Sequence, residues 1–128
     1  MIQVKKVTFT PADIFAMYVT PQLVLPAPPA GMVNNILGVT HDLVFNTLAY
    51  TGANSLRYFS NIAVDDTIIT GLYELISIVN RNLPGKQTDG LYLPFSTTKN
   101  FYVTTDAQAA TGDSNIDAYI IYEVVALD

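Results

Sequence analysis

Residues 20–31 read Thr20-Pro21-Gln22-Leu23-Val24-Leu25-Pro26-Ala27-Pro28-Pro29-Ala30-Gly31, and four of the chain's seven prolines lie among them. Proline lacks a backbone N–H and fixes its own φ, and it pushes the preceding residue toward extended geometry. Helix is therefore excluded from most of this stretch, and residues 22–25 remain as a short extended segment. Because a central strand needs every N–H for its ladder, we expect this segment at a sheet edge or a strand end.

Outside this stretch, alternating apolar residues and β-branched residues predict strands along most of the chain. The segment 91–95 contains Pro94, which places it at an edge. The segment 116–127 is apolar on both faces beyond Ala118, except at Glu123, which is typical of a central strand between two layers. The predicted strands cover residues 2–9, 32–45 with a bulge, 46–51, 56–59, 91–95, 100–104 and 116–127.

Helical signals are few. Thr10 suits an N-cap and Pro11 a first helical position, which predicts a single turn over residues 12–16. Residues 65–80 carry apolar side chains at helical spacing, but a short helix followed by a strand fits them equally well. Residues 82–90 and 105–115 have the composition of loops. About eight short strands and at most one helix of length predict an all-β sandwich or barrel, as a single domain over residues 1–128.

Charged residues make up only 13% of the chain, whereas ordinary soluble domains carry about 25%. A surface with so little charge suggests that partner subunits cover much of it. The net charge of −5 and the scattered lysines and arginines argue against nucleic-acid binding. The absence of cysteine fits a reducing compartment, and we expect neither a transmembrane helix nor a secretory signal.

Two pairs of adjacent titratable residues are candidate catalytic groups. His41-Asp42 resembles half of a catalytic triad, but no nucleophile motif accompanies it, so we expect a solvent-facing or interface histidine. Asp65-Asp66 could act in general acid–base chemistry, although helix caps or turn residues explain the pair better.

Two further sets of residues are candidate binding groups. Oxygen ligands for calcium gather in one loop, but their spacing fits no EF-hand, which favours a polar loop tip. Aromatic residues could stack on sugars, although core or interface packing is the more common role. The candidate calcium ligands are Asp106, Asp113, Asn115 and Asp117. The candidate sugar-stacking residues are Tyr58, Phe59, Tyr92 and Tyr102. We therefore expect no catalytic residue, no metal site and no cofactor.

Short motifs spread along the chain resemble a family of small structural proteins of tailed phages and prophages, of the head-decoration, auxiliary-capsid or head-fibre-base type. The similarity weakens at Pro29-Ala30, which lengthen a turn, and over residues 72–85. The motifs that carry it are Thr20-Pro21, Leu23-Val24-Leu25-Pro26-Ala27-Pro28, Gly31, Tyr50, Gly112-Asp113 and Tyr119-Ile120-Ile121-Tyr122-Glu123-Val124-Val125.

The resemblance implies a non-enzymatic virion protein with a jelly-roll-like antiparallel β-sandwich, often a homotrimer. Its expected partners are itself, the phage major capsid protein and a head-fibre protein, without nucleic acid or membrane. An acidic chain suits the outer capsid surface after assembly in the host cytoplasm.

The N-terminal strand and the proline-rich segment are the expected interface, because extended backbone can add to a neighbour's sheet. Aspartate at Leu23 and Leu25 is expected to abolish association while the monomer stays folded. The predicted interface residues are Val4, Val7, Pro21, Leu23, Leu25, Pro26 and Pro28.

Two other functions stay open. A carbohydrate- or receptor-binding module would use Tyr58, Tyr92 or Tyr102 beside a polar loop, and specific glycan binding would distinguish it. A small hydrolase would use His41, and its activity would be lost on His41→Ala.

Overall fold

The structure is a computed structural model that describes residues 1–44, 46–53, 55–60, 68–74 and 86–127. These ranges hold one helix and eight strands. The helix is neither long enough nor apolar enough to span a membrane. In chain order the elements are β1 (Ile2–Phe9), α1 (Pro11–Met17), β2 (Gln22–Leu25), β3 (Met32–Val44), β4 (Ser55–Ser60), β5 (Ile68–Glu74), β6 (Lys86–Thr97), β7 (Phe101–Thr105) and β8 (Ile116–Ala126).

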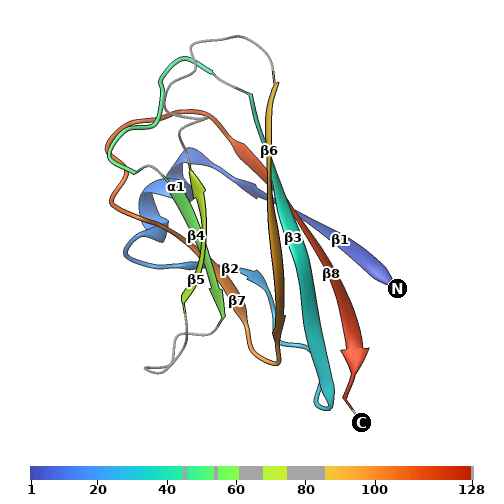
Figure 1. Cartoon of the computed structure of the whole chain (residues 1–128). Coiled ribbons are helices and arrows are strands. Elements are labelled where there is room, and N and C mark those ends of the chain that lie inside the picture. The colour runs from blue at the N-terminus through green and yellow to red at the C-terminus, as the bar shows by residue number, and fades with distance from the viewer. Residues whose placement is uncertain (45, 54, 61–67, 75–85, 128) are drawn as a thin grey trace.

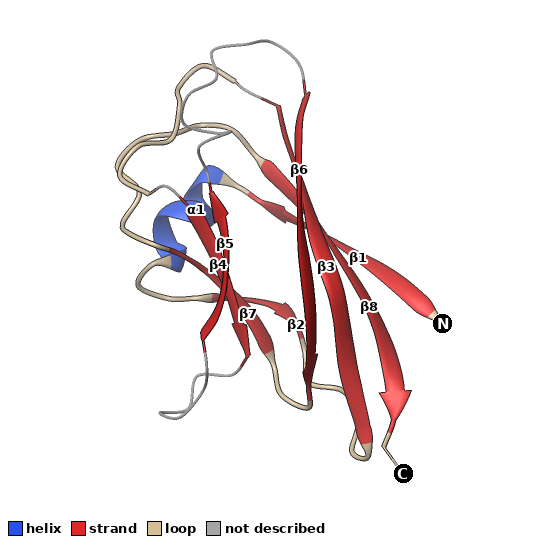
Figure 2. Cartoon of the chain, viewed as in Figure 1, coloured by secondary structure: helices blue, strands red, loops and turns tan. Residues whose placement is uncertain are grey.

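The strands form two four-stranded antiparallel sheets that face each other (Figures 1 and 2). The first sheet has the order β1-β8-β3-β6 and the second has the order β2-β7-β4-β5. The pairs β1·β8, β2·β7, β3·β6 and β4·β5 are nested along the chain. Such nesting is what results when one long four-plus-four hairpin is rolled up, so the fold is the predicted jelly-roll sandwich.

The helix α1 forms for the local reasons that the sequence indicated. Thr10 Oγ1 accepts from the Asp13 N–H at 3.3 Å, and Asp13 Oδ2 accepts from the Thr10 N–H at 2.9 Å. This reciprocal capping box satisfies two backbone donors at the start of the helix, and Pro11 occupies a position where no N–H is needed. The predicted turn over residues 12–16 is confirmed within α1.

The proline-rich segment behaves as predicted. Its strand β2 lies at an edge of the second sheet and pairs only with β7 among the described strands. A turn then leads to β3, with the Met32 N–H donating to the Pro29 carbonyl at 3.0 Å and Gly31 at φ 80°. That left-handed conformation at the third turn position favours glycine.

The long strands of the first sheet also match the predictions in part. The register of β3 shifts between Ile36 and Gly38, which is the expected bulge, and β6 lies at the edge that Pro94 indicated. Strand β8 is central between β1 and β3. Its inner residues are buried, but Tyr119 and Ile121 on its outer face are only half-buried. The prediction that layers cover both faces of this strand is therefore wrong within the described residues.

Two predicted elements and one of two open alternatives are wrong, each because tertiary pairing overrides local composition. Residues 46–51 form no regular strand and make only an isolated bridge, Thr51 to Thr111. The helical alternative for residues 65–80 fails where the chain is described, because Ile68–Glu74 is the edge strand β5. Lys86–Gly90, expected in a loop, continues β6 alongside Thr40–Val44. The rest of both segments lies outside the described residues.

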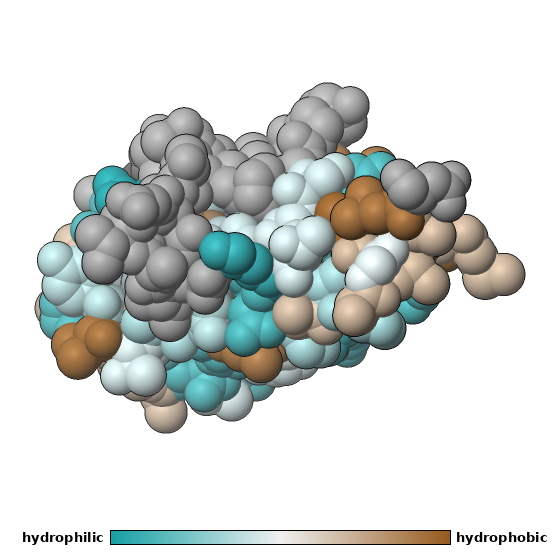
Figure 3. Space-filling view, turned by 90° about the horizontal axis from the view of Figure 1, so that it is seen from below, coloured by the Kyte–Doolittle hydropathy of each residue, from teal (hydrophilic) through white to brown (hydrophobic). Residues whose placement is uncertain are grey.

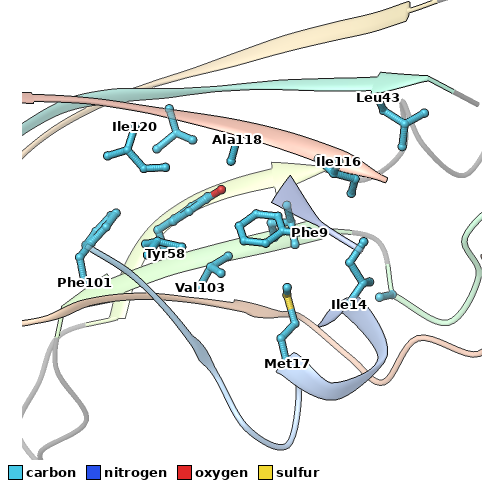
Figure 4. Packing of buried hydrophobic residues seen from close by; sticks show 14 of the residues in the cluster. Phe9, Ile14, Met17, Leu43, Tyr58, Phe101, Val103, Ile116, Ala118 and Ile120 are labelled. Carbon is cyan, nitrogen blue, oxygen red and sulfur yellow. The ribbon is translucent and has the colours of Figure 1, made fainter. Parts of the chain in front are cut away.

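The core lies between the two sheets and is closed at one end by α1 (Figure 4). Tyr58 and Phe101 stack with ring centroids 5.6 Å apart, and both side chains are fully buried. Ile14 and Met17 of α1 reach the same cluster as Phe9 of β1. Burying each such side chain contributes about 1.5–3 kcal/mol, so the helix is held chiefly by this apolar contact.

Candidate functional site

Two strand edges lie on the same side of the sandwich. Strand β1 ends the first sheet, β2 ends the second, and α1 joins them, whereas β5 contacts β6 at the opposite side. Among the described strands nothing pairs with the outer edge of β1 or of β2. Each edge therefore presents backbone N–H and C=O groups that another chain can pair with.

The structure separates the seven predicted interface residues by exposure. Val4 is 61% exposed and Leu23 is 45% exposed, whereas Leu25 is 3% exposed and belongs to the core. Val7 packs against that core. The side chains that a partner can reach are Val4, Leu23 and Pro26, with Pro21 and Pro28 partly covered. The interface itself stays a prediction, but Leu25 cannot serve it through its side chain.

The outer face of the first sheet changes character along its length. Near α1 it is polar, because Thr8 Oγ1 donates to Asp117 Oδ1 at 2.6 Å and Lys6 Nζ lies 3.8 Å from Asp117 Oδ2. Toward the start of β1 it is apolar, with Val4 opposite Ile121 in the register. Ile2 and Val125 are 58% and 37% exposed at the same end. Figure 3, seen from below, shows separate brown hydrophobic patches among pale and teal polar residues.

The outer face of the second sheet carries an apolar row. Leu23 of β2, Tyr102 of β7 and Phe59 of β4 are register neighbours, and the rings of Phe59 and Tyr102 stack 5.6 Å apart. In the next row Arg57 lies opposite Thr104. A hollow of about 400 Å³ opens beside these rows, lined by Tyr18, Pro21, Arg57, Phe59, Thr104 and Thr105.

The only histidine lies inside the sandwich, so the expected solvent-facing or interface position is wrong. His41 is 4% exposed and shares a hydrogen bond through Nε2 with the hydroxyl of Tyr58. Its sequence neighbour Asp42 lies on the outer face of the same strand, because adjacent strand residues point to opposite faces. The pair therefore cannot work as a catalytic His–Asp unit. Burial lowers the pKa of His41 to about 3, despite the opposing charge of Asp42.

This burial predicts a pH dependence of stability. The folded state leaves His41 neutral down to a pKa of about 3, while the unfolded chain takes up a proton near 6.5. The contribution to the free energy of unfolding is therefore present above pH 6.5 and is lost as the pH falls below it, by about 1.4 kcal/mol per unit. Urea denaturation between pH 6.5 and about 5 measures this slope before most ordinary carboxylates, with pKa values near 4, titrate. His41→Gln should remove the slope, and an unchanged slope in that variant would contradict the assignment.

The acidic loop residues hold loops together. Asp113 Oδ1 accepts from the Leu48 N–H at 2.8 Å and from the Thr47 N–H at 3.1 Å. Its Oδ2 accepts from Asn46 Nδ2 at 3.1 Å and from the Thr47 hydroxyl. The Thr47 hydroxyl is the main reason that the pKa of Asp113 is lowered.

This network leaves the Asp113 carboxylate fully used within the protein. Asp117 is engaged with Thr8 and Lys6, while Asn115 is exposed. Among the described residues no group of three or more acidic or histidine side chains could hold a metal ion. The loop that suggested calcium binding therefore connects residues 46–48 to Asp113 through hydrogen bonds.

The remaining candidates separate by position. Tyr58 is buried in the core, so it cannot stack on a sugar. Phe59 lies on the outer face of the second sheet but is only 8% exposed, and Tyr102 beside it is half-buried. Asp65 and Asp66, and the side chain of Tyr92, lie outside what the structure describes. Arg57 and the hollow beside it were not predicted. The available signal was an arginine between Leu56 and Tyr58, which alternation places on the face opposite to theirs.

No protein-family model matches the chain, and no curated protein matches it. Two solved phage structures share its fold. A chain of the cyanophage Pam1 capsid asymmetric unit has a TM-score of 0.54 at 16% identity, over 100% of this chain and 84% of that one. A chain of the acid-stable capsid of Helicobacter pylori bacteriophage KHP30 has a TM-score of 0.53 at 12% identity, over 99% and 93%. At these identities the likeness concerns the fold.

Proposed function

We propose that this protein is a non-enzymatic structural subunit of a bacteriophage virion, which decorates or cements the outer capsid surface as a homo-oligomer. The observation that carries the proposal is the end-to-end match with chains of two phage capsids. Because the match covers 84% and 93% of those chains, they are only slightly larger than this one.

The surface supports a binding role. Only 13% of the residues are charged, and large apolar side chains are exposed on the edge strands β1 and β2. An exposed apolar edge is a liability for a protein that stays alone in water, and neighbouring subunits that pair with it remove the liability. The acidic net charge favours the outside of a shell over a surface that lines packaged DNA. A homotrimer that contacts the major capsid protein, or an adaptor for a head fibre, fits these properties.

Solution mass tests the self-association directly. We expect light scattering to give about three times the chain mass of 14.0 kDa at micromolar concentration. Leu23→Asp places a charge on the exposed side of β2, so it should shift the mass to that of a monomer and abolish co-sedimentation with capsids. The circular dichroism and unfolding midpoint of the variant should match those of the wild type, since Leu23 is 45% exposed. A wild-type chain that stays monomeric and binds no capsid would contradict the proposal.

A further inference from the structure

One cationic side chain, Arg57, and two aromatic side chains, Tyr18 and Phe59, are among the residues that line the hollow on the second sheet. Arg57 and Phe59 stand on the same face of β4, two residues apart, and Tyr18 and Pro21 from the connection after α1 form the rim. Tyr18 is 50% exposed, so this rim is open to an incoming group. The volume of about 400 Å³ lies in the range of pockets that take a side chain or a small molecule.

The Nε–H of the arginine in this hollow has no acceptor among the described residues. This Nε–H is buried, and no described residue forms an ion pair with the guanidinium. The neighbouring Thr104 hydroxyl donates elsewhere, to the Met17 carbonyl at 2.7 Å. Leaving a buried donor on a charged group unsatisfied is costly, so this group needs an acceptor that the described residues do not supply. The guanidinium fork matches a carboxylate best.

The described acidic side chains differ in how far they are engaged. Asp13 caps α1, Asp113 and Asp117 are held as described above, and Asp42 and Asp106 also have partners. Glu123 makes only an exposed contact with the N-terminal ammonium, at 3.8 Å and with 35% of its side chain accessible. Exposed ion pairs of this kind contribute little, so Glu123 is free to exchange partners.

The surroundings of Glu123 are mostly apolar, like the aromatic side chains that line the hollow. Glu123 lies on the outer face of the first sheet, and strand alternation places Ile121 and Val125 beside it on that face. Val4 lies opposite Ile121 and is 61% exposed. The register partners of Glu123 are Ile2 on β1 and Asn35 on β3. Glu123 is therefore a carboxylate among mostly apolar side chains, and it can accept hydrogen bonds from a cation that lies beside Phe59 and Tyr18.

We propose that Glu123 of one copy enters the hollow of the next copy and pairs there with Arg57. This inference rests on the proposed self-association. The contact joins two different surfaces, the outer face of the first sheet and the outer face of the second. Repeated head-to-tail contacts of this kind close into rings when the rotation allows, and a trimer is one such ring.

A charge swap tests the pairing. Arg57→Glu and Glu123→Arg should each weaken self-association in sedimentation velocity about thirtyfold or more, because each leaves a desolvated charge without its partner. The double variant should recover most of the wild-type association, which a merely structural role for either residue would not produce. Arg57→Gln and Glu123→Gln serve as milder variants, and circular dichroism checks that each is folded. Lys99→Glu, a charge reversal on an exposed residue in the β6–β7 turn, is the matched control and should associate normally.

The outcomes separate this inference from the proposed function. If the wild type associates and the single variants associate equally well, the Arg57–Glu123 contact is wrong while self-association stands. If Arg57→Gln lowers the unfolding midpoint at concentrations where the chain is monomeric, the partner of Arg57 lies in its own chain, and the inference is overturned. Binding of a glycan that carries carboxylates, lost in Arg57→Gln without any change in mass, would also overturn it. A wild-type monomer without capsid binding would instead reject the proposed function.

Discussion

Replacing Gly112 with alanine is expected to remove a large share of the stability of this fold. The glycine has a φ of 138°, and a Cβ built on it would overlap the ring of Tyr50. That ring is 1% exposed, and its hydroxyl donates to the Ser114 carbonyl, so it has no room to move aside. The unfavourable φ costs about 1–2 kcal/mol, and forcing an extra carbon into a packed site adds about 1–3 kcal/mol.

The matched control is Gly31→Ala. Gly31 also has a left-handed φ, of 80°, but a Cβ there would meet nothing within 4 Å. Only the backbone term applies, so this variant should lose about 1 kcal/mol and stay folded. Urea denaturation of the two variants separates the overlap with Tyr50 from the cost of φ. Equal losses in the two would show that Tyr50 does not constrain the 112–114 turn.

Leu25→Asp is expected to prevent folding altogether, whereas Leu23→Asp leaves the monomer intact. Leu25 is 3% exposed within the core cluster, and an unpaired carboxylate there has no compensating partner among the residues of that cluster. The cost should exceed about 4 kcal/mol, which is a large share of the roughly 5–15 kcal/mol that stabilises a typical domain. Leu23 is exposed on the same strand, so its variant controls for the charge itself.

Soluble yield, near-ultraviolet circular dichroism and urea denaturation compare the two variants. We expect Leu25→Asp to accumulate as insoluble protein and Leu23→Asp to unfold at the wild-type urea concentration. A soluble, cooperatively folding Leu25→Asp protein would contradict the placement of Leu25 in the core.

The contrast between these two leucines shows where sequence reasoning stops. Leu23 and Leu25 were both predicted at the interface because they lie on an extended edge segment, and residues two apart on a regular strand share a face. The register between β2 and β7 shifts between them, and that bulge turns Leu25 inward while Leu23 stays exposed. Nothing in Leu23-Val24-Leu25 signals the shift, because its cause is the pairing with β7.

Features with a local cause were predictable. The capping box of Thr10 and Asp13, the edge positions of β2 and the Pro94 strand, and the bulge in β3 all follow from a few neighbouring residues. Features that depend on distant residues were not. The composition of residues 46–51 predicts a strand, but Asp113 accepts hydrogen bonds from the backbone N–H groups of Thr47 and Leu48. The sequence around His41 predicts a surface position, but in the fold its side chain is buried against Tyr58.

The candidate site divides in the same way. Exposed apolar positions on edge strands, such as Val4 and Leu23, follow from the proline pattern and the alternation. The hollow around Arg57 does not, because Tyr18, Phe59 and Thr104 come from three separate segments that only the fold brings together.

The central claim is that the protein is a built-in part of a phage particle. Quantitative mass spectrometry of density-purified particles, released from cells that carry the gene, tests it most directly. The account predicts that the chain bands with intact capsids in a fixed ratio to the major shell protein and stays with them after DNA is removed by nuclease. Particles that lack the chain, while the surrounding lysate contains it, would contradict the account.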